Sequence, residues 1–310
     1  MKHRESPLYS FSALRTIPGA LEPSFDALAK RACPNGGFAS DSECARPSRP
    51  DATAWAILAL AAVGTDEESL ELSRSWLAGR QLSDGRVCLT RDHREVVWPT
   101  PLAVLAWQGS PVHLAAQERA AEFLLGFGGE SLPRVPMLGH DTTLIGWPWI
   151  ARTHSWVEPT ALAMMALRVA GHRDHARVDE GRDLLLDRRL SEGGWNYGNT
   201  TAFGQGLLPA PSSTGIALSA LIGLVEAAPL QSSIAYLSAE ATRLRSPLSL
   251  AWSLLGLGAF GARPAGALVW VVECLERQTY LGPYDTALLA QLLLSAVVSE
   301  GIVGGLAEDG

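Results

Sequence analysis

Two acidic side chains stand just before Thr-Ala dipeptides at the expected starts of buried helices. Glu158 lies in the segment Trp-Val-Glu-Pro-Thr-Ala, and Asp51 lies in Arg-Pro-Asp-Ala-Thr-Ala. A carboxyl group in an apolar cavity can donate a proton to an alkene or an epoxide if burial keeps it protonated. Acidic residues also cap helix N-termini, and this structural role is the alternative for both, above all for Asp51. We expect Glu158 to be a general acid that Asp51 assists.

The loop before Glu158 contains two histidines. His154 stands four residues before the acid and can tune its proton affinity, so it joins the catalytic candidates. His140, Asp141 and His154 can also be interpreted as metal ligands. Their separations of 14 and 13 residues match no known ligand pattern, so we expect no metal and no cofactor. Packing of the loop is the remaining interpretation.

Aromatic residues gather in the same connecting segments. Their faces stabilise cations by about 0.5 to 2 kcal/mol each, and they also line apolar pockets. Trp195 follows two glycines in a repeated motif, so we expect it to pack between helices. Two asparagines beside it offer hydrogen bonds, although asparagine is also common in turns. The expected substrate-binding residues are Trp98, Trp147, Trp149, Trp156, Asn196, Tyr197, Asn199, Tyr284 and Asp285.

One phrase, a turn followed by Thr-small-large-Ala-x-x-Ala-Leu, recurs along the chain. Its six copies, the last two looser, begin at Thr53, Thr100, Thr160, Thr214, Leu248 and Thr286. Each copy is apolar around nearly its whole circumference, which predicts a helix buried on all sides. Before the copies lie segments such as 68–77, 115–125 and 177–186, with apolar residues at three- and four-residue steps. That spacing predicts amphipathic outer helices.

The alternation of amphipathic and wholly apolar helices predicts an all-α fold, an (α/α)6 toroid of six helical hairpins with inner and outer rings. An open solenoid fits less well, because both helices of each hairpin would keep a polar face and the ends would be polar caps. The expected organisation is an N-terminal extension over 1–24, a single toroid domain over 25–300 and a C-terminal tail over 301–310.

The connections from outer to inner helices differ in length. Four are long, over 32–50, 81–97, 128–157 and 191–212, whereas those near 245 and over 279–284 are short. Long loops inside a compact domain are usually functional, so we expect the site at the end where the inner helices begin. Six helix N-termini there favour anions and lower carboxyl pKa values, so Glu158 needs desolvation or a partner to stay protonated at neutral pH.

Three loops carry related glycine motifs. They are Pro-Asn-Gly-Gly-Phe over 34–38, Leu-Ser-Asp-Gly-Arg over 82–86 and Leu-Ser-Glu-Gly-Gly-Trp over 190–195. With the Thr-Ala-Leu phrase, they resemble the prenyltransferase and squalene-oxidase repeat family, and so the terpenoid cyclases, such as squalene-hopene cyclase, and the protein prenyltransferase β-subunits. The resemblance covers residues 25–300. It implies a toroid that holds an apolar, isoprenoid-like substrate and cyclises it by proton-initiated, class II chemistry.

The chain departs from this family at its acidic motif, Asp-x-Asp-Asp-Thr-Ala, of which it has no intact copy. Aligned on the threonine, Glu158 and Asp51 fall where the family's proton donor stands, but Pro159 and Ala52 replace its neighbour. The zinc ligands of protein prenyltransferases and the Asp-Asp-x-x-Asp sequence that would bind magnesium are not found. Two alternatives stay open: a non-catalytic isoprenoid- or lipid-binding protein or partner subunit, and a carbohydrate-active toroid, which needs paired carboxylates in a polar cleft.

Composition bears on partners and location. A formal net charge of −7 without a basic stripe argues against a nucleic-acid partner. Cys33, Cys44, Cys88 and Cys274 form no metal or disulfide pattern, so we expect ordinary thiols. Without an apolar leader or a membrane-spanning apolar run, the expectation is a cytoplasmic protein, and a patch that binds a membrane peripherally is compatible with it.

Overall fold

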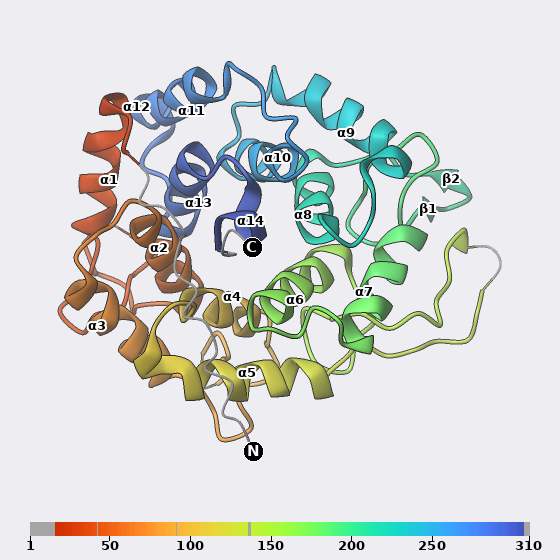
Figure 1. Ribbon diagram of the computed structural model, residues 1–310, viewed down its shortest axis with the longest axis horizontal. Helices are drawn as coiled ribbons and strands as arrows, with labels where there is room; N and C mark the ends of the chain where they lie inside the picture. Colours follow the sequence, from red (N-terminus) through yellow and green to blue (C-terminus); the bar gives the residue numbers. More distant parts are fainter. Residues whose placement is uncertain (1–15, 42, 91, 136–137, 307–310) are drawn as a thin grey trace, which may run out of the picture.

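The computed structural model describes residues 16–41, 43–90, 92–135 and 138–306. Seen down its shortest axis, the chain forms a ring of helices in two concentric layers (Figure 1). This arrangement confirms the α/α toroid that the alternating helix pattern predicts.

The inner layer consists of the six copies of the repeated phrase. Its helices are α2 (Pro50–Ala62), α4 (Pro99–Ala106), α6 (Val157–Val169), α8 (Pro211–Leu221), α10 (Pro247–Ala259) and α13 (Thr286–Val297). Each inner helix packs against the next, and α13 packs against α2, which closes the layer into a ring. Because every inner helix has another helix on both sides, it needs apolar residues around its whole circumference.

The outer layer consists of the amphipathic segments. Its helices are α1 (Glu22–Ala29), α3 (Glu67–Ala78), α5 (Leu114–Gly126), α7 (Ala176–Asp187), α9 (Ala227–Ala241) and α11 (Ala267–Glu276). Every outer helix packs against an inner helix adjacent to it in the sequence. The remaining elements are short: η1 (Gly19–Leu21), η2 (Pro111–His113), α12 (Gln278–Leu281), α14 (Gly301–Leu306), β1 (Thr201–Ala202) and β2 (Gln205–Gly206). The two strands pair antiparallel.

The starts of the inner helices are fixed by local sequence. Four of these helices begin with proline, whose fixed φ suits the first helical position and whose missing N–H is not needed there. Helix α13 is capped instead by Asp285, whose Oδ1 accepts the backbone N–H of Leu288 at 2.8 Å. Five of the six inner helices therefore begin at positions that their own first residues mark.

The threonine of the repeated phrase ties each long loop to the inner helix that follows it. In the first four repeats, its Oγ1 accepts a hydrogen bond from a backbone N–H in the preceding loop. The four bonds run from Phe38 to Thr53, Val87 to Thr100, Trp147 to Thr160 and Trp195 to Thr214, at 2.9 to 3.0 Å. Because these threonines are fully buried, the repeated residue has a structural role.

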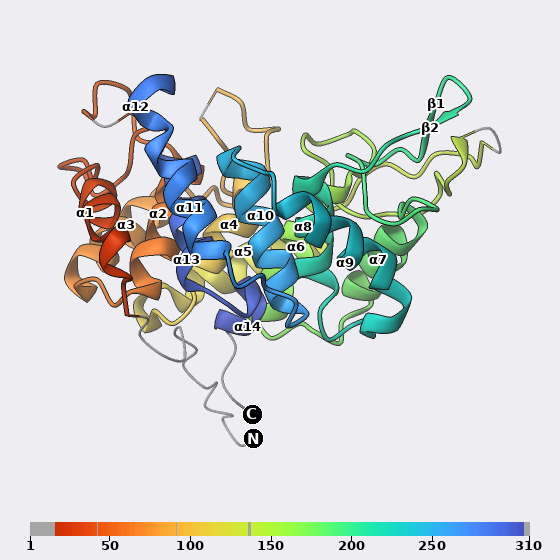
Figure 2. The same ribbon diagram turned by 90° about the horizontal axis from the view of Figure 1, so that it is seen from above.

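The end at which the inner helices begin is called the mouth below. The β1–β2 hairpin and α12 project at one end of the molecule in Figure 2, and α14 lies at the opposite end. Helix α14 packs against α6, α8 and α10 inside the ring. Residues 301–306, part of the expected C-terminal tail, form this helix at the end of the ring opposite the mouth.

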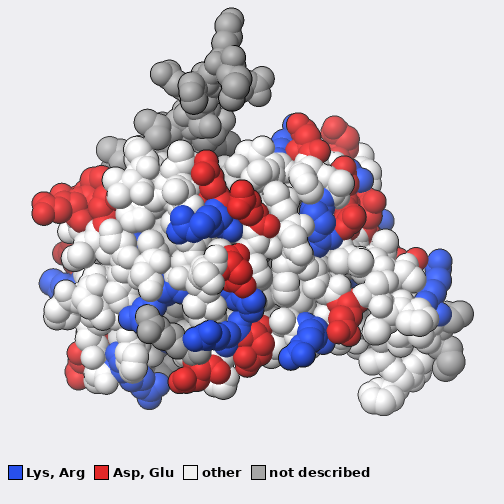
Figure 3. All heavy atoms as spheres, turned by 90° about the horizontal axis from the view of Figure 1, so that it is seen from below, with Lys and Arg blue, Asp and Glu red and all other residues white. Residues whose placement is uncertain are grey.

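The surface in Figure 3 carries acidic and basic residues side by side, without a broad area of either sign. None of the helices in the described part of the chain is both long and apolar enough to cross a membrane. The face drawn in Figure 3 thus offers no continuous basic surface.

Candidate functional site

A cavity of about 190 Å³ lies at the mouth, between the first turns of the inner helices. Pairs of residues four apart line it: Asp51 and Trp55 on α2, Trp98 and Leu102 at α4, Glu158 and Leu162 on α6, and Ala287 and Gln291 on α13. Residues four apart share one face of a helix, so each of these helices turns one face of its first turns inward. Trp149 and Trp252 complete the lining.

Four tryptophans form most of the apolar wall. Trp55 and Trp252 meet edge to face with ring centroids 5.7 Å apart, and Trp98 and Trp149 do so at 5.8 Å. The sequence interpretation included Trp98 and Trp149 but missed the other two, which lie inside the repeated phrase. The available signal for Trp55 was its position four residues after Asp51. Such aromatic faces can stabilise a cation in the cavity.

Glu158 lies in the first turn of α6 and faces this cavity half-buried. No residue of the described chain forms a hydrogen bond or ion pair with its carboxyl group. Desolvation by the surrounding apolar groups raises its pKa to about 7. The helix N-termini at the mouth act in the opposite direction, because their dipoles favour the ionised form. The carboxyl group is consequently able to hold and release a proton near neutral pH.

Asp51 lies in the same cavity but has a different environment. Its two oxygens accept hydrogen bonds from Arg49, from Nε at 2.9 Å and from Nη2 at 2.7 Å. This bidentate ion pair engages both oxygens and raises the pKa of Arg49 through the hydrogen bond and the charge of Asp51. Asp51 contributes charge to the cavity, whereas the unpaired carboxyl belongs to Glu158.

Gln291 is the polar residue of the cavity that the sequence interpretation missed. Its side chain is 7% exposed, and its Oε1 has no hydrogen-bond partner among the described residues. An unpaired buried polar group costs about 1 to 3 kcal/mol. The glutamine stands inside an otherwise apolar helix, where no motif marked it. It was therefore recognisable only after the helix had been placed in the ring.

Two of the predicted lining residues lie in the protein interior instead. Trp147 is buried, and its Nε1 donates to the Leu124 carbonyl at 3.0 Å. The hydroxyl group of Tyr284 donates to the Cys274 carbonyl at 2.7 Å, and burial raises its pKa. Trp195, expected to pack between helices, is buried in the same way as Trp147. Such hydrogen-bonded, buried rings hold the layers together.

The polar candidates of the fourth long loop are also outside the cavity. Asn196 donates from Nδ2 to the Leu208 carbonyl at 2.6 Å, and the exposed Tyr197 accepts the N–H of Val157 on its backbone carbonyl. Asp285 serves as the cap of α13 described above. These contacts brace the starts of the inner helices and place none of the three side chains at the mouth cavity.

His154 faces a second cavity of about 200 Å³, together with His140 and Asn199. Its ring packs against that of Trp156 at an interplanar angle of 41°, with centroids 4.6 Å apart, and does not line the cavity of Glu158. The structure therefore separates the expected assistant from the acid. In the described parts of the chain, no three His, Cys, Asp or Glu side chains are placed to share a metal ion. Arg188 adds a buried positive charge to this second cavity.

The largest of these hollows, about 540 Å³, lies at the other end of the ring, near the C-termini of α2 and α4. Its charged residues are Glu67 and Arg74, which form an ion pair with a distance of 2.6 Å between Oε1 and Nη1. Because its acid is already paired, this cavity has no counterpart to Glu158. The mouth cavity, although smaller, is the one of these two that contains an acid without a partner among the described residues.

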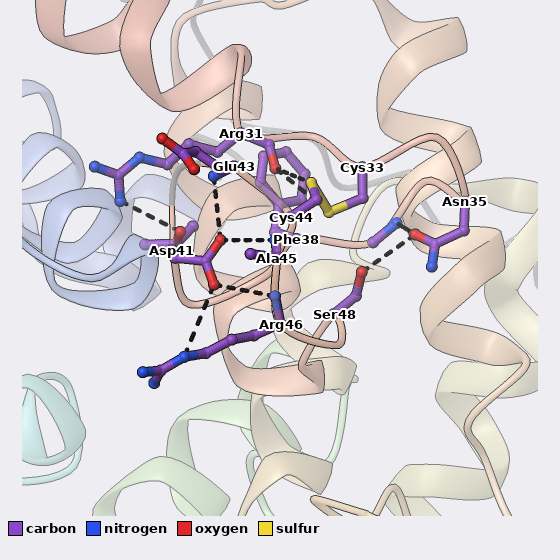
Figure 4. The surroundings of a disulfide bond; sticks show 12 residues. Arg31, Cys33, Asn35, Phe38, Asp41, Glu43, Cys44, Ala45, Arg46 and Ser48 are labelled. Atoms are coloured by element: carbon purple, nitrogen blue, oxygen red, sulfur yellow. Dashed lines mark hydrogen bonds and ion pairs between the residues drawn. A yellow bond between two sulfur atoms is a disulfide. The ribbon is translucent and has the colours of Figure 1, made fainter.

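The loop before α2 corrects one expectation from the sequence. Cys33 and Cys44, expected as ordinary thiols, form a disulfide with their Cα atoms 5.8 Å apart (Figure 4). Asp41, inside the closed loop, accepts the backbone N–H groups of Glu43, Ala45 and Arg46. The turn these bonds form brings the cysteines together, which their spacing alone did not indicate. Disulfides are typical of oxidising compartments, which weighs against the expected cytoplasmic location.

The other two cysteines are free and buried, as expected. Cys274 lies on α11, and burial raises the pKa of its thiol. Cys88 lies in the second long loop. Neither lines the mouth cavity.

No protein-family profile and no curated protein sequence matches the chain. Solved structures of two kinds of enzyme are similar to it. The GH76A α-1,6-mannanase of Salegentibacter sp. HEL1_6 is 13% identical over 90% of this chain and 97% of its own, with a TM-score of 0.62. The type II terpene cyclase MstE of Scytonema, in complex with geranylgeranyl dihydroxybenzoate, is 13% identical over 93% of this chain and 98% of its own, with a TM-score of 0.60.

At this level of identity the comparisons show the fold. They confirm the likeness to a terpenoid cyclase toroid, and they show an equal likeness to a mannanase toroid. The mannanase has also been solved as an inactive variant with two consecutive aspartates replaced, in complex with α-1,6-mannotriose. The choice between these chemistries depends on the side chains of the mouth cavity.

Proposed function

We propose that the protein is a terpenoid-cyclase-like enzyme that cyclises an isoprenoid-like substrate in the mouth cavity. The observation that carries this proposal is Glu158, an unpaired carboxyl group with a pKa of about 7 inside a cavity walled by tryptophans. A protonated acid in an apolar site is suited to donating a proton to an alkene. Such a substrate is largely apolar, which matches the tryptophan and leucine lining.

The reaction would be a net isomerisation. The carboxyl proton of Glu158 forms a new C–H bond at one alkene carbon, and the other alkene carbon becomes a cation. The π electrons of a second alkene in the same molecule then form the ring bond. Loss of a proton to water at the mouth restores an alkene, and Glu158 regains a proton from solvent. The faces of Trp55, Trp98, Trp149 and Trp252 stabilise the cation by about 0.5 to 2 kcal/mol each.

The size of the chain is compatible with this function. The type II terpene cyclase MstE is matched over 98% of its length by this chain. Substrate complexes of that cyclase exist with geranylgeranyl dihydroxybenzoate. The likeness supports a substrate site within one toroid, and the small cavity supports a smaller buried part of the substrate.

A glycan-directed function is the second candidate, because two carboxyl groups, Asp51 and Glu158, share the cavity and aromatic rings also bind sugars. Two observations favour the isoprenoid. Asp51 is fully engaged by Arg49, so the cavity offers one unpaired acid where glycoside hydrolysis needs two. Within the described chain, consecutive acidic residues occur on the outer helices α3 and α7 and not at the cavity.

The proposal includes peripheral contact with a membrane, from which an apolar substrate could enter. Phe203 at the tip of the β1–β2 hairpin, Leu208 and Tyr280 on α12 are exposed apolar residues on segments that flank the mouth. Exposed aromatic and aliphatic side chains favour insertion at the lipid interface.

Incubation with linear isoprenoids of ten to twenty carbons, followed by gas chromatography and mass spectrometry, tests the function. We expect a cyclic isomer with the native protein and at least a hundredfold slower formation with Glu158→Gln, because general acid catalysis contributes about 10² to 10⁴-fold. Glu192→Gln, an exposed acid in the fourth long loop, is the matched control and should retain full activity.

Each other outcome selects a different function. A tightly bound isoprenoid without turnover would indicate a carrier. Hydrolysis of α-mannan oligosaccharides with no reaction of isoprenoids would indicate the glycan-directed enzyme. Full cyclase activity in Glu158→Gln would reject the assigned acid.

A further inference from the structure

We propose that Gln291 binds a hydroxyl group of the ligand, so that the substrate is an isoprenoid-like alcohol whose buried part contains about eight non-hydrogen atoms. This inference rests on the proposed function only in taking the mouth cavity as the substrate site. It assigns a specificity-determining residue and a functional group to the ligand.

Six buried side-chain atoms of the described chain have no hydrogen-bond partner, and Oε1 of Gln291 is the one acceptor among them. Gln117 is equally buried, at 6% exposure, but its Nε2 donates to the Val104 carbonyl at 2.9 Å and to Gln108 Oε1 at 2.7 Å. Gln291 lies on the mainly apolar helix α13, where nothing in the described chain reaches its Oε1. Buried polar groups are nearly always paired, so the missing partner of Gln291 is expected to come from a ligand in the cavity that it lines.

The other charges of the cavity limit the chemistry of that ligand group. No basic residue is among the described residues that line the cavity, and the nearby Arg49 is already paired with Asp51, so a carboxylate or a phosphate would find no positive charge there. A hydroxyl group is neutral, and its single oxygen can donate to Oε1 and accept from Nε2 of the same amide. An alcohol therefore satisfies Gln291 without adding a charge to an apolar site.

The position of Gln291 also orients the ligand. In the closed inner ring α13 and α6 are separated by two helices in either direction, so Gln291 and Glu158 face the cavity from opposite sides (Figure 1). A substrate whose hydroxyl group is bound at α13 extends its hydrocarbon chain across the cavity to α6. The alkene that receives the proton is then the one remote from the hydroxyl group.

The cavity volume limits the buried part of the substrate. A cavity of about 150 Å³ in another protein accommodates benzene, and this one measures about 190 Å³. In proportion, it holds about eight non-hydrogen atoms. A ten-carbon isoprenoid alcohol, with eleven such atoms, slightly exceeds this limit, and longer chains would protrude further from the mouth.

The test is the binding of two ten-carbon probes, measured through the fluorescence of the cavity tryptophans. One is geraniol, and the other is the diene of the same skeleton without the hydroxyl group. We expect the native protein to bind geraniol at least about tenfold more tightly than the diene, the factor that about one hydrogen bond contributes. In Gln291→Met, of similar volume, geraniol should lose about tenfold in affinity, and the two probes should bind equally.

Gln205→Met, on the exposed hairpin, is the matched control and should keep the native preference. The folding of Gln291→Met is checked by its unfolding midpoint, which should not fall because no internal hydrogen bond is lost. Equal affinity of both probes for the native protein, or an unchanged preference in Gln291→Met, would overturn the proposal. The measured affinity does not depend on turnover. A preference for the alcohol without formation of a cyclic product would therefore contradict only the proposed reaction. Cyclisation with no such preference would contradict only the role of Gln291.

Discussion

Two carboxyl groups in one cavity behave differently because their nearest neighbours differ. Asp51 is held in a bidentate ion pair by Arg49, whereas Glu158 has no partner among the described residues and is surrounded by apolar side chains. Desolvation therefore acts on Glu158 without compensation and raises its pKa to about 7. The same cavity thus contains a compensated charge and an acid that can be protonated, an arrangement typical of sites that divide roles between two acids.

The raised pKa of Glu158 predicts that the free energy of unfolding falls as pH rises. The unfolded chain ionises Glu158 near pH 4.5 and the folded chain near pH 7, so folding stability is lost as pH rises between these values and the loss is complete above pH 7. The shift corresponds to about 3 kcal/mol. Glu158→Gln should therefore exceed the native protein in free energy of unfolding by up to about 3 kcal/mol at pH 8, and by little at pH 4.

Urea unfolding at the two pH values measures this difference. The exposed Glu192→Gln should show no such change with pH. A pH-independent effect of Glu158→Gln would mean that Glu158 is not held in a desolvating site. The same protonation should also appear in catalysis, as a fall in activity as pH rises through about 7.

At the scale of elements, the cavity depends on how closely α8 and α10 approach. A Cβ atom at Gly256 would lie 2.5 Å from the Gly215 carbonyl oxygen, and one at Gly215 would lie 2.1 Å from the Trp252 carbonyl oxygen. Both glycines are required because backbone atoms occupy the space of a side chain. This contact fixes the backbone of Trp252 and therefore one wall of the cavity.

Gly256→Ala should force the two helices apart and lower the free energy of unfolding by about 1 to 3 kcal/mol, the usual cost of overpacking. Displacement of Trp252 should also alter the fluorescence of the cavity. Gly126→Ala in α5, where no atom lies within 4 Å of the added Cβ, is the control and should change stability by less than about 0.5 kcal/mol. Equal effects of the two substitutions, measured by urea unfolding, would contradict the close approach.

The loop before α2 contains the disulfide between Cys33 and Cys44. The disulfide closes a loop with a sequence separation of 11 residues, and cross-links over loops of this length stabilise by about 2 to 3 kcal/mol. We expect the free energy of unfolding of the native protein to be lower by this amount when it is measured in the presence of a reductant. The Cys33→Ser, Cys44→Ser double variant should show the same lowered stability with or without reductant. If the free energy of unfolding of the native protein did not change with reductant, the disulfide would be contradicted.

At the scale of the whole molecule, the ring is closed by the packing of α13 on α2. In an open solenoid, each hairpin contacts only its neighbours. The loss of a terminal hairpin therefore lowers the free energy of unfolding only by the contribution of that one hairpin and its interface. In a closed ring, the same loss exposes an apolar face of α2 and one of α10 at once. The ring should accordingly unfold as one unit.

Deletion of residues 262–310, which contain α11 to α14, tests this closure. We expect the shortened chain to lose its cooperative urea transition, measured by circular dichroism, while the full chain unfolds in a single step. A shortened chain that unfolds cooperatively with about five sixths of the native stability would instead indicate a solenoid.

The amino-acid sequence by itself determined the six hairpins and their assignment to two layers, because apolar periodicity records burial locally along each helix. It also placed Glu158 and Asp51 in first turns, because capping positions and proline mark helix starts. Tertiary structure decided which loop side chains meet. Trp149 reaches the cavity but Trp147 packs beneath α5, and His154 turns to another hollow. Which side chains meet depends on distances between segments that are remote in the sequence. For this reason the place of Gln291 in the cavity and the pairing of Cys33 with Cys44 were visible only in the folded ring.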